Sequence, residues 1–307
     1  MREHVESHVE DVSLLAQPLH FEISGRTAKN RFLKAAMIEK LSSWSVTDLQ
    51  ACGIPSPELA QVYRRWGEGG AGVILTGNVM VTFQDIEAPG NAIVPLEANF
   101  HGERFGGFRR MMEEAQKTRQ LDIGAGLACR PNPISASDVQ LLKIDFPDVK
   151  FARPRAATKS EIKDVLGCFP PAAIYLHKAG FDGMELHAAH GYLLSQFISE
   201  ATNHRDDEHG GSIVNRARIV IDIAKSIRCQ LPGSSGFILG VTLNSVEFQE
   251  HGIDPDGCKE LCKLLEDVEF DFVELSGGNY ETISYTYTLR ESTKKGEAFF
   301  SSISPRK

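Results

Sequence analysis

The sequence predicts an α/β fold built on a parallel sheet. Short apolar runs bounded by turn residues recur along the chain, and stretches with helical periodicity separate them. A chain in which strands and helices alternate places its strands parallel, because each helix returns the chain to the same end of the sheet. With 307 residues, of which 42% are hydrophobic, the chain is long enough for one large domain or two smaller ones. The alternation favours a (β/α) barrel or a doubly wound sheet.

Six strands and six helices are expected in alternation. The expected strands span 31–37, 72–76, 121–127, 181–187, 237–243 and 270–275. The expected helices span about 58–69, 101–119, 159–178, 215–230, 256–267 and 290–300. Gly180 is placed to end the third helix, and Ser212 is placed to cap the fourth. The glycine-rich segment 67–72 precedes a strand, whereas a dinucleotide fingerprint follows one, so a Rossmann fold is disfavoured.

Two segments stand outside this alternation. Residues 1–17 are predicted to form a mobile tail before the domain at 18–307. Residues 128–158 contain four prolines and are predicted to form a long loop. Neither segment is expected to contribute to the sheet.

Charge and composition exclude several classes of partner. The net charge of −8 and the lack of a long basic run argue against a nucleic-acid partner, which requires clustered Lys and Arg. No window holds about 18 uninterrupted apolar residues, and residues 1–10 lack an apolar core, so neither a membrane span nor a signal peptide is expected. The six scattered cysteines are expected to be reduced thiols, and the protein is predicted to be cytoplasmic.

The most informative segment, 185–197, begins in the strand expected at 181–187. It places His187, His190 and Tyr192 at the carboxyl end of that strand, where parallel α/β folds carry their chemistry. Two neutral imidazoles can donate hydrogen bonds to one carbonyl oxygen. A phenol, with a reference pKa of about 10, can deliver a proton. This trio therefore predicts a site that polarises a carbonyl compound and protonates it.

Two other interpretations of the histidines stay open at this point. Residues three apart on a helical turn share one side, so His187 and His190 could instead be two ligands of a metal ion. Glu185 lies on the same face of the strand as His187, so the spacing alone does not exclude a metal site that includes it. The pair could also be purely structural. The phenol that follows favours the carbonyl-binding interpretation, and no metal is predicted.

The run FDGMELHAAHGYLLSQFISEATNHRDDEHGGSIVNRAR, residues 181–218, closely resembles the old yellow enzyme family of FMN-dependent ene-reductases, also called NADH:flavin oxidoreductases. A motif of this length is highly specific. The resemblance extends over roughly residues 18–300, and further matching segments are KAAM at 34–37, GVILTG at 72–77, NPISAS at 132–137, LNSVEF at 243–248 and ELSGG at 274–278.

The resemblance implies an eight-stranded (β/α)8 TIM barrel with FMN across the carboxyl ends of its strands. It implies reduction by NADPH or NADH and reoxidation by a small-molecule enone or similar activated alkene. His187 and His190 match the pair that binds the substrate carbonyl, and Tyr192 matches the proton donor. Ala36, Met37 and Gly77 match positions that line the flavin. A homo-oligomer is compatible with these features.

The sequence departs from the family pattern mainly at the flavin. Ile38 stands where the family usually has a hydroxyl or thiol side chain, and the Gln that normally ends the third strand is absent from 124–130. Thr242 stands where an Arg or Lys normally lies. The chain stops after about six of the eight β/α units, so the barrel is expected to be truncated before strands seven and eight. The alternative function is therefore an impaired relative with weak or no flavin binding.

Overall fold

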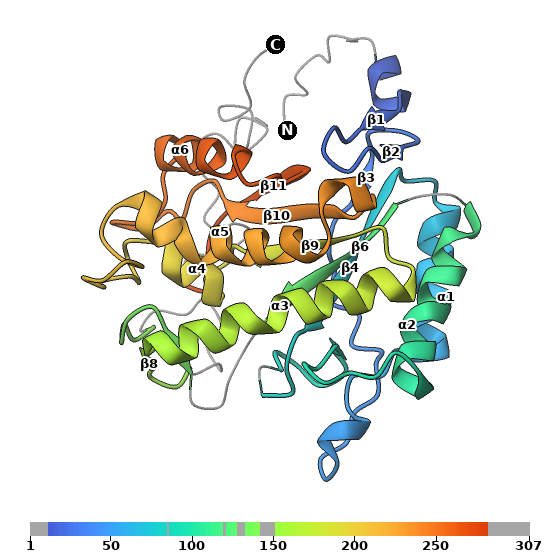
Figure 1. Ribbon diagram of the computed structural model, residues 1–307, viewed down its shortest axis with the longest axis horizontal. Coiled ribbons are helices and arrows are strands. Elements are labelled where there is room, and N and C mark those ends of the chain that lie inside the picture. Colours follow the sequence, from blue (N-terminus) through green and yellow to red (C-terminus); the bar gives the residue numbers. More distant parts are fainter. Residues whose placement is uncertain (1–11, 85, 119–120, 128–132, 142–150, 282–307) are drawn as a thin grey trace, which may run out of the picture.

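The computed structural model describes residues 12–84, 86–118, 121–127, 133–141 and 151–281. In its main sheet the strands lie in the order β11-β10-β9-β6-β4-β3, and every neighbouring pair is parallel (Figure 1). The short strand β5 also pairs with β4 in parallel. The strands of this sheet are β3 (Leu33–Lys34), β4 (Val73–Met80), β5 (Ala92–Ile93), β6 (Leu121–Leu127), β9 (Gly183–Ala188), β10 (Ile238–Asn244) and β11 (Phe272–Ser276).

Helices connect these strands and cover one face of the sheet. They are α1 (Pro57–Glu68), α2 (Gly102–Ala115), α3 (Lys159–Ala179), α4 (Leu193–Ile198), α5 (Ile213–Gln230) and α6 (Pro255–Glu266). Gly180 ends α3 in the left-handed conformation, at φ 103°, and the Ser212 side chain accepts a hydrogen bond from the third residue of α5. Both predicted boundary residues are therefore confirmed. No helix in the described ranges is long and apolar enough to cross a membrane.

Two short sheets and four short 3-10 helices complete the described elements. The hairpin of β1 (Leu19–His20) and β2 (Thr27–Ala28) is antiparallel, and β7 (Ile134–Ser135) pairs with β8 (Arg155–Ala156) in parallel. The 3-10 helices are η1 (Val12–Ala16), η2 (Leu49–Ala51), η3 (Gln116–Thr118) and η4 (Gly233–Ser235).

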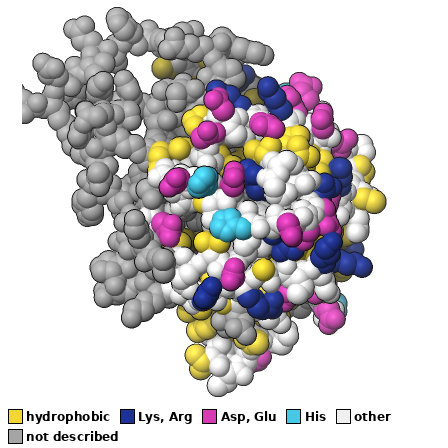
Figure 2. Space-filling view, turned by 90° about the vertical axis from the view of Figure 1, so that its left-hand side faces the viewer, with side chains coloured by type: hydrophobic (Ala, Val, Ile, Leu, Met, Phe, Trp, Pro, Cys, Tyr) yellow, Lys and Arg dark blue, Asp and Glu magenta, His cyan; other side chains and the backbone are white. Residues whose placement is uncertain are grey.

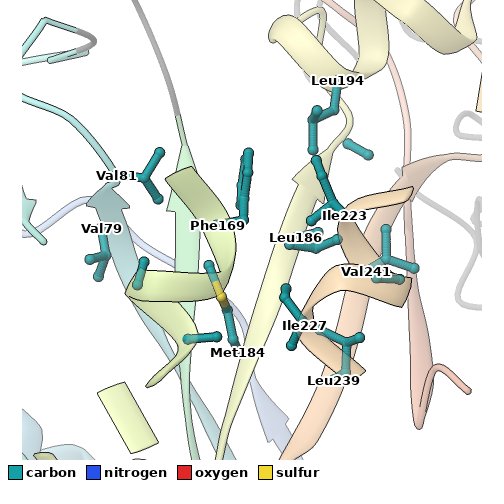
Figure 3. Close-up of a cluster of buried hydrophobic side chains, with 14 of the residues drawn as sticks. Val79, Val81, Phe169, Met184, Leu186, Leu194, Ile223, Ile227, Leu239 and Val241 are labelled. Carbon is teal, nitrogen blue, oxygen red and sulfur yellow. The ribbon is translucent and has the colours of Figure 1, made fainter. Parts of the chain in front are cut away.

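The two faces of the sheet bury different apolar clusters, because successive side chains along a strand point to opposite faces. Ile74 packs in the larger cluster between the sheet and the helices, whereas Val73 and Leu75 pack on the other face. Figure 3 shows the larger cluster, with side chains from β4, β9 and β10 packed against α3, α4 and α5. On the other face, Phe21 of the hairpin region lies 6.1 Å from the ring of Phe272. The hairpin therefore packs against the sheet surface opposite the helices.

Charged side chains of both signs are interspersed on the face that Figure 2 shows. On helices α1 and α2, exposed charged side chains form ion pairs within one helix, such as Arg64 with Glu68 and Arg109 with Glu113. Such exposed pairs stabilise a helix by only about 0.3–0.5 kcal/mol each. The fold is therefore held mainly by its apolar clusters.

The structure corrects several sequence-based expectations. The first strand, expected at 31–37, is only Leu33–Lys34, because only these two residues pair with β4. The loop expected at 128–158 contains β7 and β8, and α4 was not foreseen because six residues are too few to show a helical period. The helix expected at 290–300 lies outside the described residues. Of the tail expected at 1–17, only the exposed η1 and the residue after it are described.

Candidate active site

The carboxyl end of β9 carries a tight turn that leads into α4. His187 is still part of the strand, and His190 lies on the turn with a left-handed backbone at φ 59°. Gly191 follows at φ 78°. A non-glycine residue in this region is uncommon and persists only where its surroundings hold it. His190 is therefore a position whose backbone requires support from neighbouring strands.

The ends of β10 and β11 supply that support. The His190 backbone N–H donates to the Asn244 side-chain oxygen at 3.1 Å, and its ring Nε2 lies 2.6 Å from the Ser276 hydroxyl. Asn244 in turn donates to the buried carboxylate of Glu247 at 3.0 Å. These contacts join three neighbouring strands at one end of the sheet, so the turn is fixed by the fold itself.

The three side chains singled out in the sequence lie together. The ring centroids of His187 and His190 are 5.0 Å apart, and those of His187 and Tyr192 are also 5.0 Å apart. The Tyr192 hydroxyl lies 2.8 Å from the hydroxyl of Tyr280, which follows β11. All of them stand at the carboxyl end of the parallel sheet, where ligands bind in such folds.

Burial keeps both imidazoles uncharged at neutral pH. It lowers the pKa of His187 to about 3, with a smaller contribution from the neighbouring His190. Burial also lowers the pKa of His190. A neutral imidazole carries one N–H donor and one acceptor nitrogen. The pair can therefore donate hydrogen bonds to an acceptor oxygen without adding a positive charge.

The residues expected to line a flavin lie just after β3 and within β4. Met37 is 50% exposed and Ala36 is exposed as well, whereas Gly77 is buried. The Gly77 backbone N–H donates to the carboxylate of Glu39 at 2.8 Å, and a Cβ at this position would overlap that carboxylate and the Met37 carbonyl. Met37 and Gly77 are thus adjacent, and close packing requires the glycine. Glu39 was not expected at this site, although it is an acidic residue two positions after Met37.

A buried pair of carboxyl groups lies on β9 and β11. Glu185 is almost fully buried, its Oε1 accepts a 2.5 Å hydrogen bond from the Thr242 hydroxyl, and its carboxyl also interacts with that of Glu274. Burial and the neighbouring Glu274 raise the pKa of Glu185 well above its ordinary value, and burial also raises that of Glu274. Thr242 lies on β10, between these two strands, and its hydroxyl is the donor to Glu185.

The chemistry of these side chains can be compared with that of FMN, the cofactor that the resemblance implies. A flavin ring is flat and largely apolar and has carbonyl groups along one edge. The exposed, small or apolar side chains of Ala36 and Met37 fit its ring surface. The residues at this end of the sheet therefore fit the ring of a flavin. Across the described ranges, no three His, Cys, Asp or Glu side chains are grouped so as to hold a metal ion.

Comparison with known proteins identifies the relatives of this chain. The sequence profile of the NADH:flavin oxidoreductase / NADH oxidase family matches residues 17–283. The chain is 46% identical over 305 residues to the NADH-dependent flavin oxidoreductase nadA of Aspergillus parasiticus, a match covering 96% of this chain and 68% of that protein. It is 34% identical to the NADH-dependent flavin oxidoreductase iliE of Hypocrea jecorina, which covers 84% of this chain and 66% of that protein. The chain thus spans about two thirds of the length of these relatives.

The fold also matches a solved structure. The old yellow enzyme homologue from Zymomonas mobilis superposes with a TM-score of 0.72 at 22% sequence identity, covering 88% of this chain and 77% of that one. The predicted (β/α)8 barrel fold is therefore confirmed, with strands one to six of the barrel present as β3, β4, β6, β9, β10 and β11. Together, the profile match over most of the chain and the 46% identity to nadA show that this protein belongs to the NADH:flavin oxidoreductase / NADH oxidase family, the old yellow enzymes.

Proposed function

We propose that the protein is an FMN-dependent oxidoreductase that uses NADH or NADPH to reduce the carbon–carbon double bond of an α,β-unsaturated carbonyl compound. The observation that carries this proposal is the cluster of two uncharged imidazoles and a phenol at the carboxyl end of β9. The family to which the chain belongs implies a flavin and a nicotinamide reductant. The proposal assigns the FMN-binding domain to residues 18–307.

The cofactor would lie against the ends of β3 and β4. Ala36, Met37 and Gly77 would hold its ring, since they are exposed, apolar or free of a side chain. When bound, FMN supplies the hydride that the β-carbon of the alkene receives. The remaining chemistry belongs to side chains of this protein.

His187 and His190 would bind and polarise the substrate carbonyl. Each neutral ring donates one hydrogen bond, and the two donors together draw electron density from the double bond toward the oxygen. This polarisation makes the β-carbon electron-poor. Asn244 holds the His190 backbone and Ser276 contacts its ring, so the His190 side chain is already oriented before a substrate binds.

Tyr192 would complete the reduction by giving its phenolic proton to the α-carbon. Its ring packs 5.0 Å from that of His187, so a carbonyl held by the histidines would place the double bond near the phenol. Net addition of a hydride and a proton saturates the bond.

The first experiment is to purify the protein, add FMN and record the visible spectrum, then release and quantify the bound flavin. Stoichiometric FMN with a shifted flavin spectrum is expected. Single-turnover measurements on Tyr192→Phe should then show slower alkene reduction with unchanged flavin reduction by NADH or NADPH. Equal loss in both half-reactions would contradict the role of the phenol.

A second candidate function is a relative that has lost tight flavin binding. The contact favouring it is the Glu39 carboxylate on the Gly77 N–H, since an acidic side chain beside the flavin-lining residues would repel an anionic ligand. Protein that stays colourless after FMN is added, while remaining monodisperse and folded, would favour this candidate over the first.

A further inference from the structure

A second phenol lies against the proposed proton donor. Tyr280 follows β11 in the chain, and its hydroxyl is 2.8 Å from that of Tyr192. The two rings are nearly perpendicular, with their centroids 5.7 Å apart. A hydroxyl can both donate and accept a hydrogen bond. This pair is therefore a direct phenol-to-phenol contact between strands four and six of the barrel.

The segment that carries Tyr280 is itself held against the site. The Gly278 backbone N–H donates to the Val246 carbonyl at 2.9 Å, and the ring of Tyr280 packs 5.0 Å from that of Phe151. A Cβ placed on Gly191 would lie 3.3 Å from the Cβ of Asn279, so this segment also borders the turn before Tyr192. The Tyr280 ring is thus packed from two sides.

The end of β11 supports the site in two places. Ser276 contacts the ring of His190, and Tyr280, four residues later, contacts the hydroxyl of Tyr192. The carbonyl-binding and proton-donating residues of the proposed site are therefore both in contact with one short segment.

We propose that Tyr280 is a positioning residue that orients the Tyr192 hydroxyl and returns a proton to it after each turnover. The inference rests on the function proposed above. While Tyr192 donates toward the substrate, its oxygen accepts a hydrogen bond from Tyr280, because each phenol has a single proton to donate.

The proton transfers balance. The Tyr192 O–H bond breaks as the new C–H bond forms on the α-carbon, leaving a phenolate on Tyr192. The Tyr280 O–H then breaks as Tyr192 regains its proton, and Tyr280 takes a proton from water. No redox change occurs in these steps. A hydrogen bond donated to a phenolate is charge-assisted and therefore stronger than one to the neutral phenol, so Tyr280 lowers the barrier to proton release.

The test compares Tyr280→Phe with the matched control Tyr175→Phe, which removes the same atom from a phenol that has no hydrogen-bond partner among the described residues. The chain holds six tyrosines, so labelling them with ¹³C at Cζ gives few signals, and the Tyr192 signal is assigned from its loss in Tyr192→Phe. Titrating the protein without FMN should show that Tyr280→Phe raises the pKa of Tyr192 by about one unit, whereas the control leaves it unchanged. An unchanged Tyr192 titration in Tyr280→Phe would overturn the inference.

A kinetic measurement on the FMN-loaded protein supplies the second readout. Tyr280→Phe should slow alkene reduction about tenfold, which corresponds to about 1.4 kcal/mol, and leave flavin reduction unchanged. If Tyr192→Phe slows alkene reduction but Tyr280→Phe does not, the inference fails and the proposed function stands. If Tyr192→Phe reduces the alkene at the full rate, the role of the phenol fails and the relay fails with it, whereas alkene reduction itself stands. FMN-loaded protein that reduces no activated alkene would overturn the proposed function.

A second variant keeps the inference testable if Tyr280→Phe does not fold. Phe151→Leu leaves both phenols in place but removes the ring that packs on Tyr280. It should raise the pKa of Tyr192 by less than Tyr280→Phe does, because the phenol pair is loosened and not lost. No change in that pKa would contradict the positioning role.

Discussion

Replacing Glu185 with glutamine should stabilise the protein at pH 8. In the native structure the Glu185 Oε1 accepts a hydrogen bond from Thr242, and the buried carboxyl also interacts with that of Glu274. Glutamine keeps an oxygen for Thr242 and replaces the other oxygen by an amide that can donate to Glu274. It also removes one of two like charges from a buried site.

The magnitude follows from the burial of the carboxyl. Desolvation of a buried polar group costs about 1–3 kcal/mol, and more when the group is charged, so Glu185→Gln should raise the free energy of unfolding by about that amount where the native carboxyl is ionised. In a chain of this size, 1 kcal/mol changes Tm by roughly 2 °C, which predicts a rise of about 2–6 °C.

The pH dependence makes the prediction specific. The pKa of Glu185 is raised in the folded state, so the folded protein holds this proton at a pH where the unfolded chain has lost it. The free energy of unfolding therefore falls as the pH rises from the ordinary glutamate pKa to the raised pKa of folded Glu185, and the loss is complete above that raised pKa. The gain from Glu185→Gln should be small at pH 4.5 and full once the native carboxyl ionises.

The assay is urea unfolding followed by circular dichroism at pH 4.5 and pH 8, with Glu250→Gln as control. The Glu250 side chain is 91% exposed, so its replacement should change stability by less than about 0.5 kcal/mol. A Glu185→Gln protein that is less stable than wild type at pH 8, or equally stabilised at both pH values, would refute this reasoning.

Three further predictions concern other parts of the structure. Gly77→Ala should lower Tm, because its Cβ would overlap the Glu39 carboxylate and the Met37 carbonyl, and an unchanged Tm in a thermal scan would contradict that packing. The pKa of His187 is lowered to about 3 in the folded protein, so the free energy of unfolding should fall as the pH drops from 6.5 toward 3. This fall should be shallower in His187→Asn, and the urea midpoint measured across this pH range tests it. Tyr175→Phe removes a buried hydroxyl without a partner in the described part of the chain and should leave the urea midpoint unchanged or raise it, whereas a clear drop would reveal a missing contact.

Much of the fold could be predicted because its elements are periodic and separated by clear turn residues. The strand expected at 121–127 matches β6 to the residue, and the helix expected at 159–178 matches α3 to within one. The trio of His187, His190 and Tyr192 could be grouped because it lies within six residues of the chain. Local sequence is informative where the contacts are local.

The remaining features depend on contacts between distant residues. Tyr280 lies 88 positions from Tyr192, and Glu39 lies 38 positions from Gly77, so neither pairing leaves a pattern within one segment. The shortness of β3 likewise depends on its neighbour, since its apolar residues alone would suit a longer strand. Such contacts can be identified only once the fold is known, because the fold brings distant strands together.

The shortness of β3 has a consequence for local opening of the sheet. Within the described ranges β3 pairs only with β4, over two positions, whereas β4 also pairs with β6. Amides held by few hydrogen bonds open at a lower free energy than amides in the middle of a sheet. Hydrogen exchange should therefore be faster at Leu33 and Lys34 than at Val73 and Ile74 of β4.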